Sequence, residues 1–325
     1  MDRLPKGFRS QKILIQLMHL QLRNLAKRRI ATILKNIDKK RPRFPFMVLT
    51  EATSDCTLNC IMCPRSQLEK SNGYMKFDLF KKVVNECSRH LSVGELLFSG
   101  IGEPFLHPQI LEMGALAKTK GVPRIRITTN ATLLTKQKTE EILNGAMFDE
   151  IGFSLDALTE ETYKKIKRGA NFQTVQGNIA YFLSRKGNYG RPFVSLHILK
   201  MRETVSEIDG FLKKWTPLLG KGDHILVKDI HNFAGQVEDR NPNDQAYDQK
   251  RLPCRQLWNF LYVTWDGDVI PCSMDPHRKL KIGNLNKSSL EELWNGPLIK
   301  EMRRIHIQEK YNEIPLCGDC KFWWY

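Results

Sequence analysis

This sequence lacks the features that define several specialised classes of protein. No apolar run approaches the roughly 18 residues that a membrane-spanning helix needs. Eight cysteines in 325 residues are too dilute for a disulfide scaffold. The start of the chain lacks the short basic region and clean apolar core of a secretory signal. We therefore expect a cytoplasmic protein rather than a membrane-spanning or secreted one.

The composition is that of a packed globular chain, but the charge is unevenly distributed. Hydrophobic residues make up 41% of the sequence, and a length of 325 residues favours two domains. The formal net charge is +16, and residues 1–43 hold thirteen Lys and Arg against two Asp. Most of the positive charge therefore belongs to an N-terminal extension, and the rest of the chain has an ordinary charge balance.

Residues 11–37 of this extension have the pattern of a basic amphipathic helix. Basic residues lie between apolar side chains that recur near a helical period. The apolar residues are Ile15, Met18, Leu22, Leu25, Ile30, Ile33 and Ile37. The favoured interpretation is that this apolar stripe packs on the body of the protein. The alternative is contact with an anionic membrane surface or an acidic partner, which would place the protein at a membrane surface. We assign residues 1–44 to the extension.

After Pro45, strand-like and helix-like stretches alternate along the chain. Expected strands cover 46–50, 95–98, 124–128, 150–155, 193–199 and 224–227, and expected helices cover 77–90, 108–120, 135–144, 159–183 (broken near residue 169) and 205–215. Because parallel neighbours need crossover connections, this order predicts an α/β fold. We expect a partial (β/α)6 TIM-like barrel over residues 45–235, with its active site at the carboxyl ends of the strands. A flat doubly wound sheet is the alternative from the pattern alone.

Three cysteines follow the first expected strand within eight residues, at Cys56, Cys60 and Cys63. Structural zinc and ferredoxin-type clusters use four protein ligands, so three thiolates leave a metal site incomplete. On a loop at the barrel mouth, three cysteines would leave one iron of a cluster open to a non-protein ligand. Scattered thiols, or zinc with a remote fourth ligand, are the alternatives.

The Cys-x3-Cys-x2-Cys spacing resembles the signature of the radical S-adenosylmethionine (SAM) superfamily. Segments 98–108, 128–135 and 153–157 resemble further motifs of that superfamily in order and spacing, although Ile101 stands where a glycine is usual. The resemblance implies a set of SAM contacts, namely Gly100, Gly102, Glu103, Asn130, Ser154 and Arg168, the last pairing with the SAM carboxylate.

The resemblance also implies the chemistry. Cys56, Cys60 and Cys63 would hold a [4Fe–4S] cluster whose fourth iron is chelated by SAM. One electron from an external low-potential donor would cleave SAM to methionine and a 5′-deoxyadenosyl radical. That radical would abstract a hydrogen atom from an unactivated carbon of the substrate, while the protein orients the carbon and excludes water.

Four more cysteines lie in the last third of the chain, at Cys254, Cys272, Cys317 and Cys320. An expected hairpin at residues 266–268 lies between Cys254 and Cys272, and Cys317 and Cys320 form a Cys-x2-Cys pair. Two pairs, each brought close by a turn, form a complete four-thiolate site for zinc or for an iron–sulfur cluster. The region resembles the SPASM/twitch extensions of radical SAM enzymes, and the cysteine count implies one auxiliary [4Fe–4S] cluster. We therefore expect a small α+β iron–sulfur domain over residues 236–325. Cys87, inside an expected helix, is interpreted as a buried apolar side chain.

The sequence indicates the cofactors more clearly than the substrate. Asp229, His231 and Asn232 follow the sixth expected strand and are weak candidates for catalytic residues. The cysteine layout is similar to that of radical SAM dehydrogenases of cyclitols, so our leading hypothesis is oxidation of a sugar or cyclitol. Modification of a ribosomally made peptide is an alternative. The basic extension suggests a third, RNA modification, but the charge is confined to one segment and we expect no specific nucleic acid partner.

Overall fold

The computed structural model describes residues 41–323 apart from 69–71, 91, 188 and 243–250. The amphipathic segment 11–37, and with it nearly all of the extension assigned to residues 1–44, lies outside the described residues. No helix in the part of the chain that the structure describes has the length and apolar character to cross a membrane.

The described residues form a nine-stranded sheet with the order β11-β10-β9-β1-β3-β4-β5-β7-β8. Its barrel part consists of six parallel strands, β1 (Met47–Thr50), β3 (Glu95–Phe98), β4 (Ile125–Thr129), β5 (Glu150–Ser154), β7 (Phe193–Lys200) and β8 (His224–Asp229). These strands follow one another in chain order without the reversal that a doubly wound sheet requires. The expected partial barrel is therefore confirmed.

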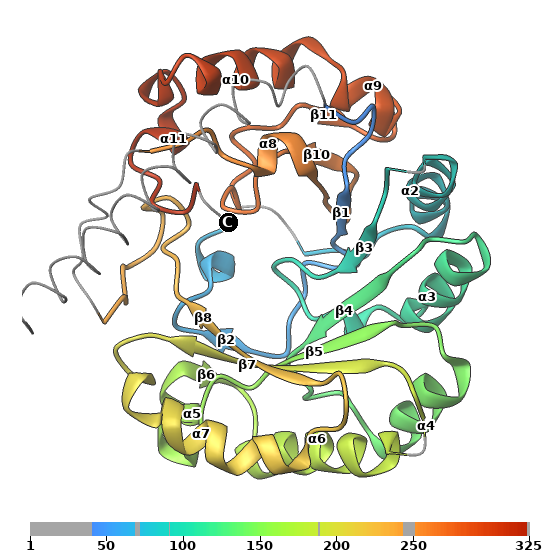
Figure 1. Ribbon diagram of the computed structural model, residues 1–325, viewed down its shortest axis with the longest axis vertical. Coiled ribbons are helices and arrows are strands. Elements are labelled where there is room, and N and C mark those ends of the chain that lie inside the picture. Colours follow the sequence, from blue (N-terminus) through green and yellow to red (C-terminus); the bar gives the residue numbers. More distant parts are fainter. Residues whose placement is uncertain (1–40, 69–71, 91, 188, 243–250, 324–325) are drawn as a thin grey trace, which may run out of the picture.

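Helices cover the outer side of the curved sheet (Figure 1). They are α2 (Phe77–Arg89), α3 (Ile110–Thr119), α4 (Lys136–Gly145), α5 (Glu160–Ile166), α6 (Phe172–Lys186) and α7 (Ile208–Trp215). On β7 the fully buried Val194, Leu196 and Ile198 belong to the main hydrophobic core. Because successive strand side chains point to opposite faces, the alternate residues Ser195 and His197 face the barrel interior. The strand pattern thus separates an apolar outer layer from a polar interior.

The C-terminal segment extends the barrel sheet. Strand β9 (Phe260–Val263) pairs in parallel with β1, and β10 (Asp268–Ile270) returns antiparallel to β9 before the short β11 (Gly283–Asn284). The hairpin expected at residues 266–268 is confirmed, with Gly267 at φ +89°. Around these strands lie α8 (Gln256–Asn259), α9 (Leu290–Trp294), α10 (Pro297–Ile307) and α11 (Pro315–Gly318). A domain boundary at residue 235 stays a prediction, since one sheet runs through both parts.

The first described residues are fixed to this C-terminal segment. The Trp294 indole nitrogen donates to the Pro42 carbonyl oxygen at 3.1 Å, and the Asn295 amide donates to the Arg43 carbonyl oxygen at 3.0 Å. Arg41 donates to the Asn295 side chain at 2.9 Å. The chain therefore enters the barrel across helix α9.

Candidate active site

A cavity of about 410 Å³ lies at the carboxyl ends of the barrel strands. Its size is in the range of small-molecule binding sites. It is lined by the three cysteines that follow β1 and by residues from the ends of β3, β4, β5, β7 and β8, with Tyr262, Ser273 and Met274 from the C-terminal segment. The barrel and the C-terminal segment thus share one cavity.

The cysteine loop is held by a short pair of strands that sequence patterns did not predict. The expected helical region 159–183 is interrupted by β6 (Lys167–Arg168), which pairs antiparallel with β2 (Asn59–Cys60). A turn follows in which the Cys63 backbone donates to the Cys60 carbonyl oxygen at 3.1 Å. A two-residue strand has no periodic pattern, so nothing in the sequence could have revealed it.

Glu103 ties the loop after β3 to the end of β4. Its buried carboxylate accepts hydrogen bonds from the Asn130 backbone at 2.8 Å, the Thr129 hydroxyl at 2.7 Å and the Phe105 backbone at 3.1 Å. Burial raises the pKa of Glu103, and these three donors oppose that shift. The adjoining Asn130 side chain donates to Thr57 at 3.1 Å and lies 3.6 Å from the Cys56 sulfur. The carboxylate therefore shapes the cavity wall beside the cysteines.

Glycine is required at position 102 by a close backbone approach. A Cβ atom there would overlap the Thr53 carbonyl oxygen and come within 2.7 Å of the Asp55 carbonyl oxygen. The Glu103 backbone also donates to the Asp55 oxygen at 2.7 Å. The segment after β3 is thereby pressed against the start of the cysteine loop.

The three thiols of the loop are half-buried and are protonated near neutral pH. Burial raises the pKa of Cys60 to about 12, and it also raises the pKa of Cys56 and Cys63. Thiolates become favourable there only beside a strong positive charge such as a metal centre. Three soft donors lining one sheltered cavity fit an iron–sulfur cluster with one open iron.

The other four cysteines also gather in one place. Burial, and then the neighbouring Cys254, Cys317 and Cys320, raise the pKa of Cys272. Two backbone N–H groups point at sulfur, from Met274 to Cys272 at 3.3 Å and from Phe322 to Cys320 at 3.4 Å. Such N–H···S contacts are typical of iron–sulfur sites. Cys87 is buried in the main core instead, as expected.

In the described part of the chain no three His, Cys, Asp or Glu side chains are grouped to hold a single metal ion. An iron–sulfur cluster distributes its cysteine ligands over several irons, whereas zinc binds all four ligands itself.

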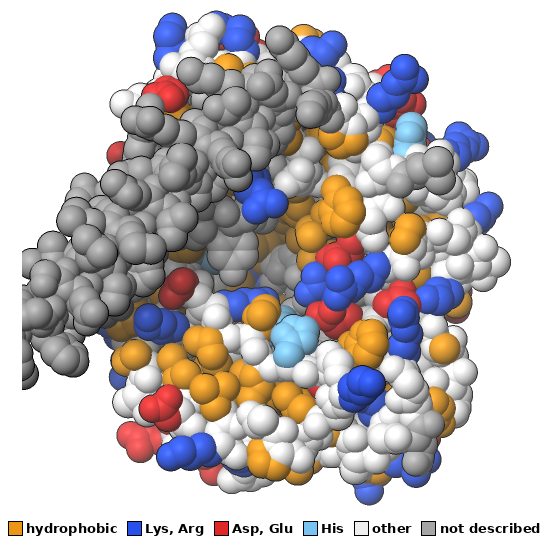
Figure 2. Space-filling view, in the orientation of Figure 1, with side chains coloured by type: hydrophobic (Ala, Val, Ile, Leu, Met, Phe, Trp, Pro, Cys, Tyr) orange, Lys and Arg blue, Asp and Glu red, His pale blue; other side chains and the backbone are white. Residues whose placement is uncertain are grey.

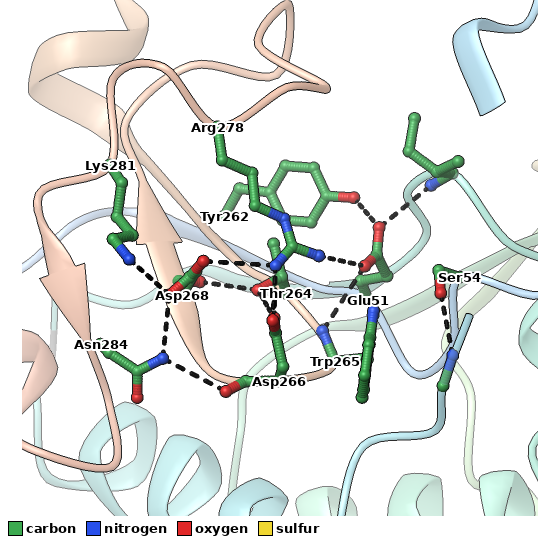
Figure 3. A network of polar contacts seen from close by, with 12 residues as sticks. Glu51, Ser54, Tyr262, Thr264, Trp265, Asp266, Asp268, Arg278, Lys281 and Asn284 are labelled. Atoms are coloured by element: carbon green, nitrogen blue, oxygen red, sulfur yellow. Dashed lines mark hydrogen bonds and ion pairs between the residues drawn. The ribbon is translucent and has the colours of Figure 1, made fainter. Parts of the chain in front are cut away.

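A polar network connects the C-terminal segment to the end of β1 (Figure 3). The fully buried Glu51 accepts a short hydrogen bond from the Tyr262 hydroxyl, lies 3.7 Å from the Arg278 guanidinium and accepts from the Ile101 backbone at 3.4 Å. Arg278 also pairs with Asp266 at 2.5 Å. Burial raises the pKa of Glu51, and Tyr262 and then Arg278 oppose that shift.

Comparison with known protein families decides the identity of this site. Residues 50–214, just over half of the chain, match the family model of the radical SAM superfamily. The chain belongs to this superfamily. Residues 254–321 match the model of an iron–sulfur cluster-binding domain, SPASM. This radical SAM enzyme therefore uses a [4Fe–4S] cluster and SAM and carries an auxiliary iron–sulfur cluster, which removes the zinc alternatives.

The enzyme is similar to proteins with different activities. It is 25% identical to the tungsten-containing aldehyde ferredoxin oxidoreductase cofactor-modifying protein of Pyrococcus furiosus, over 83% of this chain and 85% of that protein. It is 24% identical to the antilisterial bacteriocin subtilosin biosynthesis protein AlbA of Bacillus subtilis, over 93% of this chain and 70% of that protein. It is 22% identical to the SAM-dependent 2-deoxy-scyllo-inosamine dehydrogenase of Niallia circulans, over 84% of this chain and 92% of that protein.

Solved structures show the same fold. The complex of BtrN with AdoMet and 2-DOIA aligns with a TM-score of 0.57 and 18% identity, over 86% of this chain and 93% of that chain. Streptococcus suis SuiB aligns with a TM-score of 0.66 and 15% identity, over 92% of this chain and 79% of that chain. The relatives agree on the radical SAM fold and disagree on the substrate.

Most of the residues expected to contact SAM lie together in this radical SAM cavity, and one does not. The lining includes Gly100, Gly102, Glu103, Asn130 and Ser154. Arg168, by contrast, is exposed and is not part of the lining. The β2–β6 pairing turns the preceding residue inward instead: Lys167 is buried and its ammonium lies 2.7 Å from Asp156 and 3.0 Å from the Ser154 hydroxyl. Strand alternation places only one of these two adjacent cations inside, so Arg168 faces outward here and its pairing with the SAM carboxylate stays a prediction.

Two of the three catalytic candidates line the cavity. Asp229 and His231 line it. Asn232 does not, since its side chain accepts a hydrogen bond from the Gly235 backbone at 3.1 Å and caps a turn. Sequence patterns also missed Lys228, one residue before the expected group, and Tyr262, both of which line the cavity. No motif marks these two residues, because only the curvature of the sheet brings them to the mouth.

Proposed function

We propose that this radical SAM enzyme oxidises a hydroxyl-bearing carbon of a sugar- or cyclitol-sized molecule to a ketone. Cys56, Cys60 and Cys63 would hold the SAM-binding cluster, and Cys254, Cys272, Cys317 and Cys320 the auxiliary cluster. When bound, these groups would supply the radical that takes the carbon-bound hydrogen atom and an acceptor for the remaining electron. The oxidation also releases the proton of the hydroxyl group, which a side chain of the enzyme has to accept.

The position of Cys272 carries this proposal. The two residues that follow it, Ser273 and Met274, line the same cavity as Cys56 and Cys60. The auxiliary site therefore adjoins the substrate space. A cluster held by four cysteines has no open iron for a substrate and is suited to accepting an electron. An oxidation that releases one electron after hydrogen abstraction requires such an acceptor at this place.

His231 is suited to orient the substrate hydroxyl group. Burial, and then the nearby Lys228 cation, lower the pKa of His231 to about 4, so the ring is neutral near pH 7. Its Nδ1 atom has no hydrogen-bond partner among the described residues. The ring is held between Phe233 and Phe322, with ring centroids 4.4 and 5.4 Å away. A neutral imidazole with so low a pKa is a weak base, but it is a good acceptor for a hydrogen bond from the substrate hydroxyl. Asp229 lines the same cavity and is exposed to solvent, so it is the residue placed to pass the hydroxyl proton to water.

Anaerobic turnover tests the proposed reaction. The reconstituted enzyme is supplied with a reductant, SAM and a panel of polyols deuterated at the carbinol carbons. We expect a product two hydrogens lighter, with deuterium transferred to 5′-deoxyadenosine, as measured by mass spectrometry. A product that has only exchanged the carbinol deuterium for protium, with no net loss of two hydrogens, would show an epimerase and contradict the proposal. Turnover of precursor peptides alone would favour peptide modification, the activity class suggested by the similarity to AlbA.

The partners of this reaction are also part of the proposal. The electron that starts SAM cleavage would come from an external low-potential donor. Residues 11–37 are the candidate for contact with a membrane surface. On the face shown in Figure 2 the Lys and Arg side chains are interspersed with Asp and Glu, so this face gives no support to an RNA substrate.

A further inference from the structure

Lys228 places a cation in the cavity wall near the end of β8. Its side chain is partly buried and lines the same cavity as the cysteine loop. The ammonium donates a hydrogen bond to the Nδ1 atom of His197 on the neighbouring strand β7 at 3.2 Å. An ammonium group has three N–H donors, so this bond leaves others available to the cavity.

His197 cannot neutralise this cation. Because the ammonium only donates, Nδ1 must be the accepting nitrogen, and Nε2 carries the proton and lies 3.0 Å from the Ser195 hydroxyl. Burial, and then the Lys228 charge, lower the pKa of His197 to about 3. The imidazole is therefore a neutral acceptor that orients Lys228 without balancing its charge.

The carboxylates near this part of the barrel are already engaged. Asp156 pairs with Lys167 at 2.7 Å. Deeper in the barrel, Arg126 pairs with Glu95 at 2.8 Å and with Glu150 at 3.1 Å.

Two further carboxylates border the cavity. Glu103 accepts the three hydrogen bonds described above. Asp229, the next residue on the strand, also lines the cavity but is exposed to solvent, and its carboxylate makes no ion pair with Lys228. Within the described residues, Lys228 makes no ion pair with a carboxylate.

A partly buried ammonium without a counter-charge is less favourable than one that a ligand anion pairs with. Burial accordingly lowers the pKa of Lys228, while the charges of Asp156 and, more weakly, Glu150 oppose that shift. An anionic group entering the cavity would bring the missing charge and occupy the free N–H donors. Such charge-assisted bonds are among the stronger hydrogen bonds in proteins.

We propose that Lys228 binds an anionic group, a carboxylate or a phosphate, on the substrate of this enzyme. This inference rests on the proposed function and narrows it: the polyol to be oxidised is a sugar acid or a sugar phosphate rather than a neutral or amino cyclitol. Lys228 is then a residue that determines substrate specificity, and His197 is the residue that positions it.

A matched set of variants and substrates tests the inference. The wild-type holoenzyme, Lys228→Gln, Lys228→Arg and the exposed control Lys221→Gln are assayed with a neutral cyclitol, an aminocyclitol, a uronic acid and a hexose phosphate. We expect turnover of one of the two anionic compounds, and the identity of that compound distinguishes carboxylate from phosphate. Lys228→Gln should raise KM about 10- to 100-fold with a smaller change in kcat. Lys228→Arg should restore much of the loss, and Lys221→Gln should match the wild type.

Three results would overturn the inference. Oxidation of the neutral or amino cyclitol in preference to the anionic compounds refutes the role of Lys228 while the proposed oxidation stands. If no polyol is oxidised and a precursor peptide is modified, the proposed function itself fails. If equilibrium dialysis shows that Lys228→Gln weakens SAM binding more than tenfold with an unchanged substrate KM, the cation serves the SAM carboxylate instead. The wild-type substrate panel decides the question even if Lys228→Gln does not fold.

Discussion

Single residues at this site act through the backbone as much as through their side chains. Gly102 carries no functional group, yet its missing Cβ lets the loop after β3 contact the Thr53 and Asp55 carbonyl groups. Glu103, which follows it, uses both carboxylate oxygens to hold the end of β4. The cavity wall beside the cysteines therefore depends on the absence of a Cβ atom at Gly102 and on the hydrogen-bonded carboxylate of Glu103.

Gly102→Ala should therefore lower the free energy of unfolding by about 1–3 kcal/mol, because the added methyl group overlaps backbone that cannot move aside. SAM binding should fall with it, since the same loop lines the cavity. Gly177→Ala is the matched control: this exposed position in α6 has no atom within 4 Å of an added Cβ, and alanine should stabilise the helix by about 0.5–1 kcal/mol. Urea unfolding and equilibrium dialysis with SAM measure both effects. Equal stability changes in the two variants would contradict the expectation.

At the scale of elements, β9 joins the auxiliary segment to the barrel. It pairs with β1 along Met47–Thr50, and Tyr262 on β9 reaches Glu51 immediately after β1. The Tyr262 hydroxyl also approaches Gly100, where an added Cβ would lie 2.5 Å away. One buried hydrogen bond therefore links the auxiliary segment, the first strand and the loop expected to bind SAM.

Tyr262→Phe should lower the free energy of unfolding by about 1–3 kcal/mol, because it removes a hydrogen-bond donor from a buried carboxylate. Combined with Glu51→Gln, the two changes should be non-additive, with a coupling energy of about 0.5–3 kcal/mol. Urea denaturation of the single and double variants measures this coupling. Tyr189→Phe, which removes an exposed hydrogen bond to Asn144 of 2.8 Å, is the control and should change stability little. Strict additivity of Tyr262→Phe and Glu51→Gln would show that the network does not connect the two segments.

At the scale of the whole molecule, the eight cysteines divide into three groups. Three line the main cavity, four gather in the C-terminal segment and one lies in the hydrophobic core. The three cavity cysteines and the four C-terminal cysteines are expected to bind separate clusters. The first cluster would bind SAM, and the second would accept an electron.

Replacing both Cys317 and Cys320 by Ala should therefore remove about half of the iron and acid-labile sulfide bound by the anaerobically reconstituted protein, since [4Fe–4S] clusters need their thiolate ligands. The remaining cluster should still show a change in its electron paramagnetic resonance spectrum when SAM is added. Cys87→Ala is the control and should retain the wild-type iron content. An unchanged iron content in the Cys317/Cys320 variant would refute the auxiliary site.

The sequence by itself determined the parallel barrel and the grouping of the cysteines. Strand and helix periodicities are local, and the hairpin at Gly267 follows from local turn chemistry, so these features can be read without tertiary contacts. The cysteine spacings and the motifs after each strand were enough to indicate radical SAM chemistry, which the family match confirmed.

Only the tertiary structure decided which side chains face the cavity. Lys167 and Arg168 are adjacent cations, and the pairing of β6 with β2 alone determines which of them points inward. Lys228, Tyr262 and Glu51 have no motif, because their roles arise from contacts between strands that are distant in the sequence. Local patterns fix which elements form; the register and curvature that bring those elements together fix the chemistry of the site.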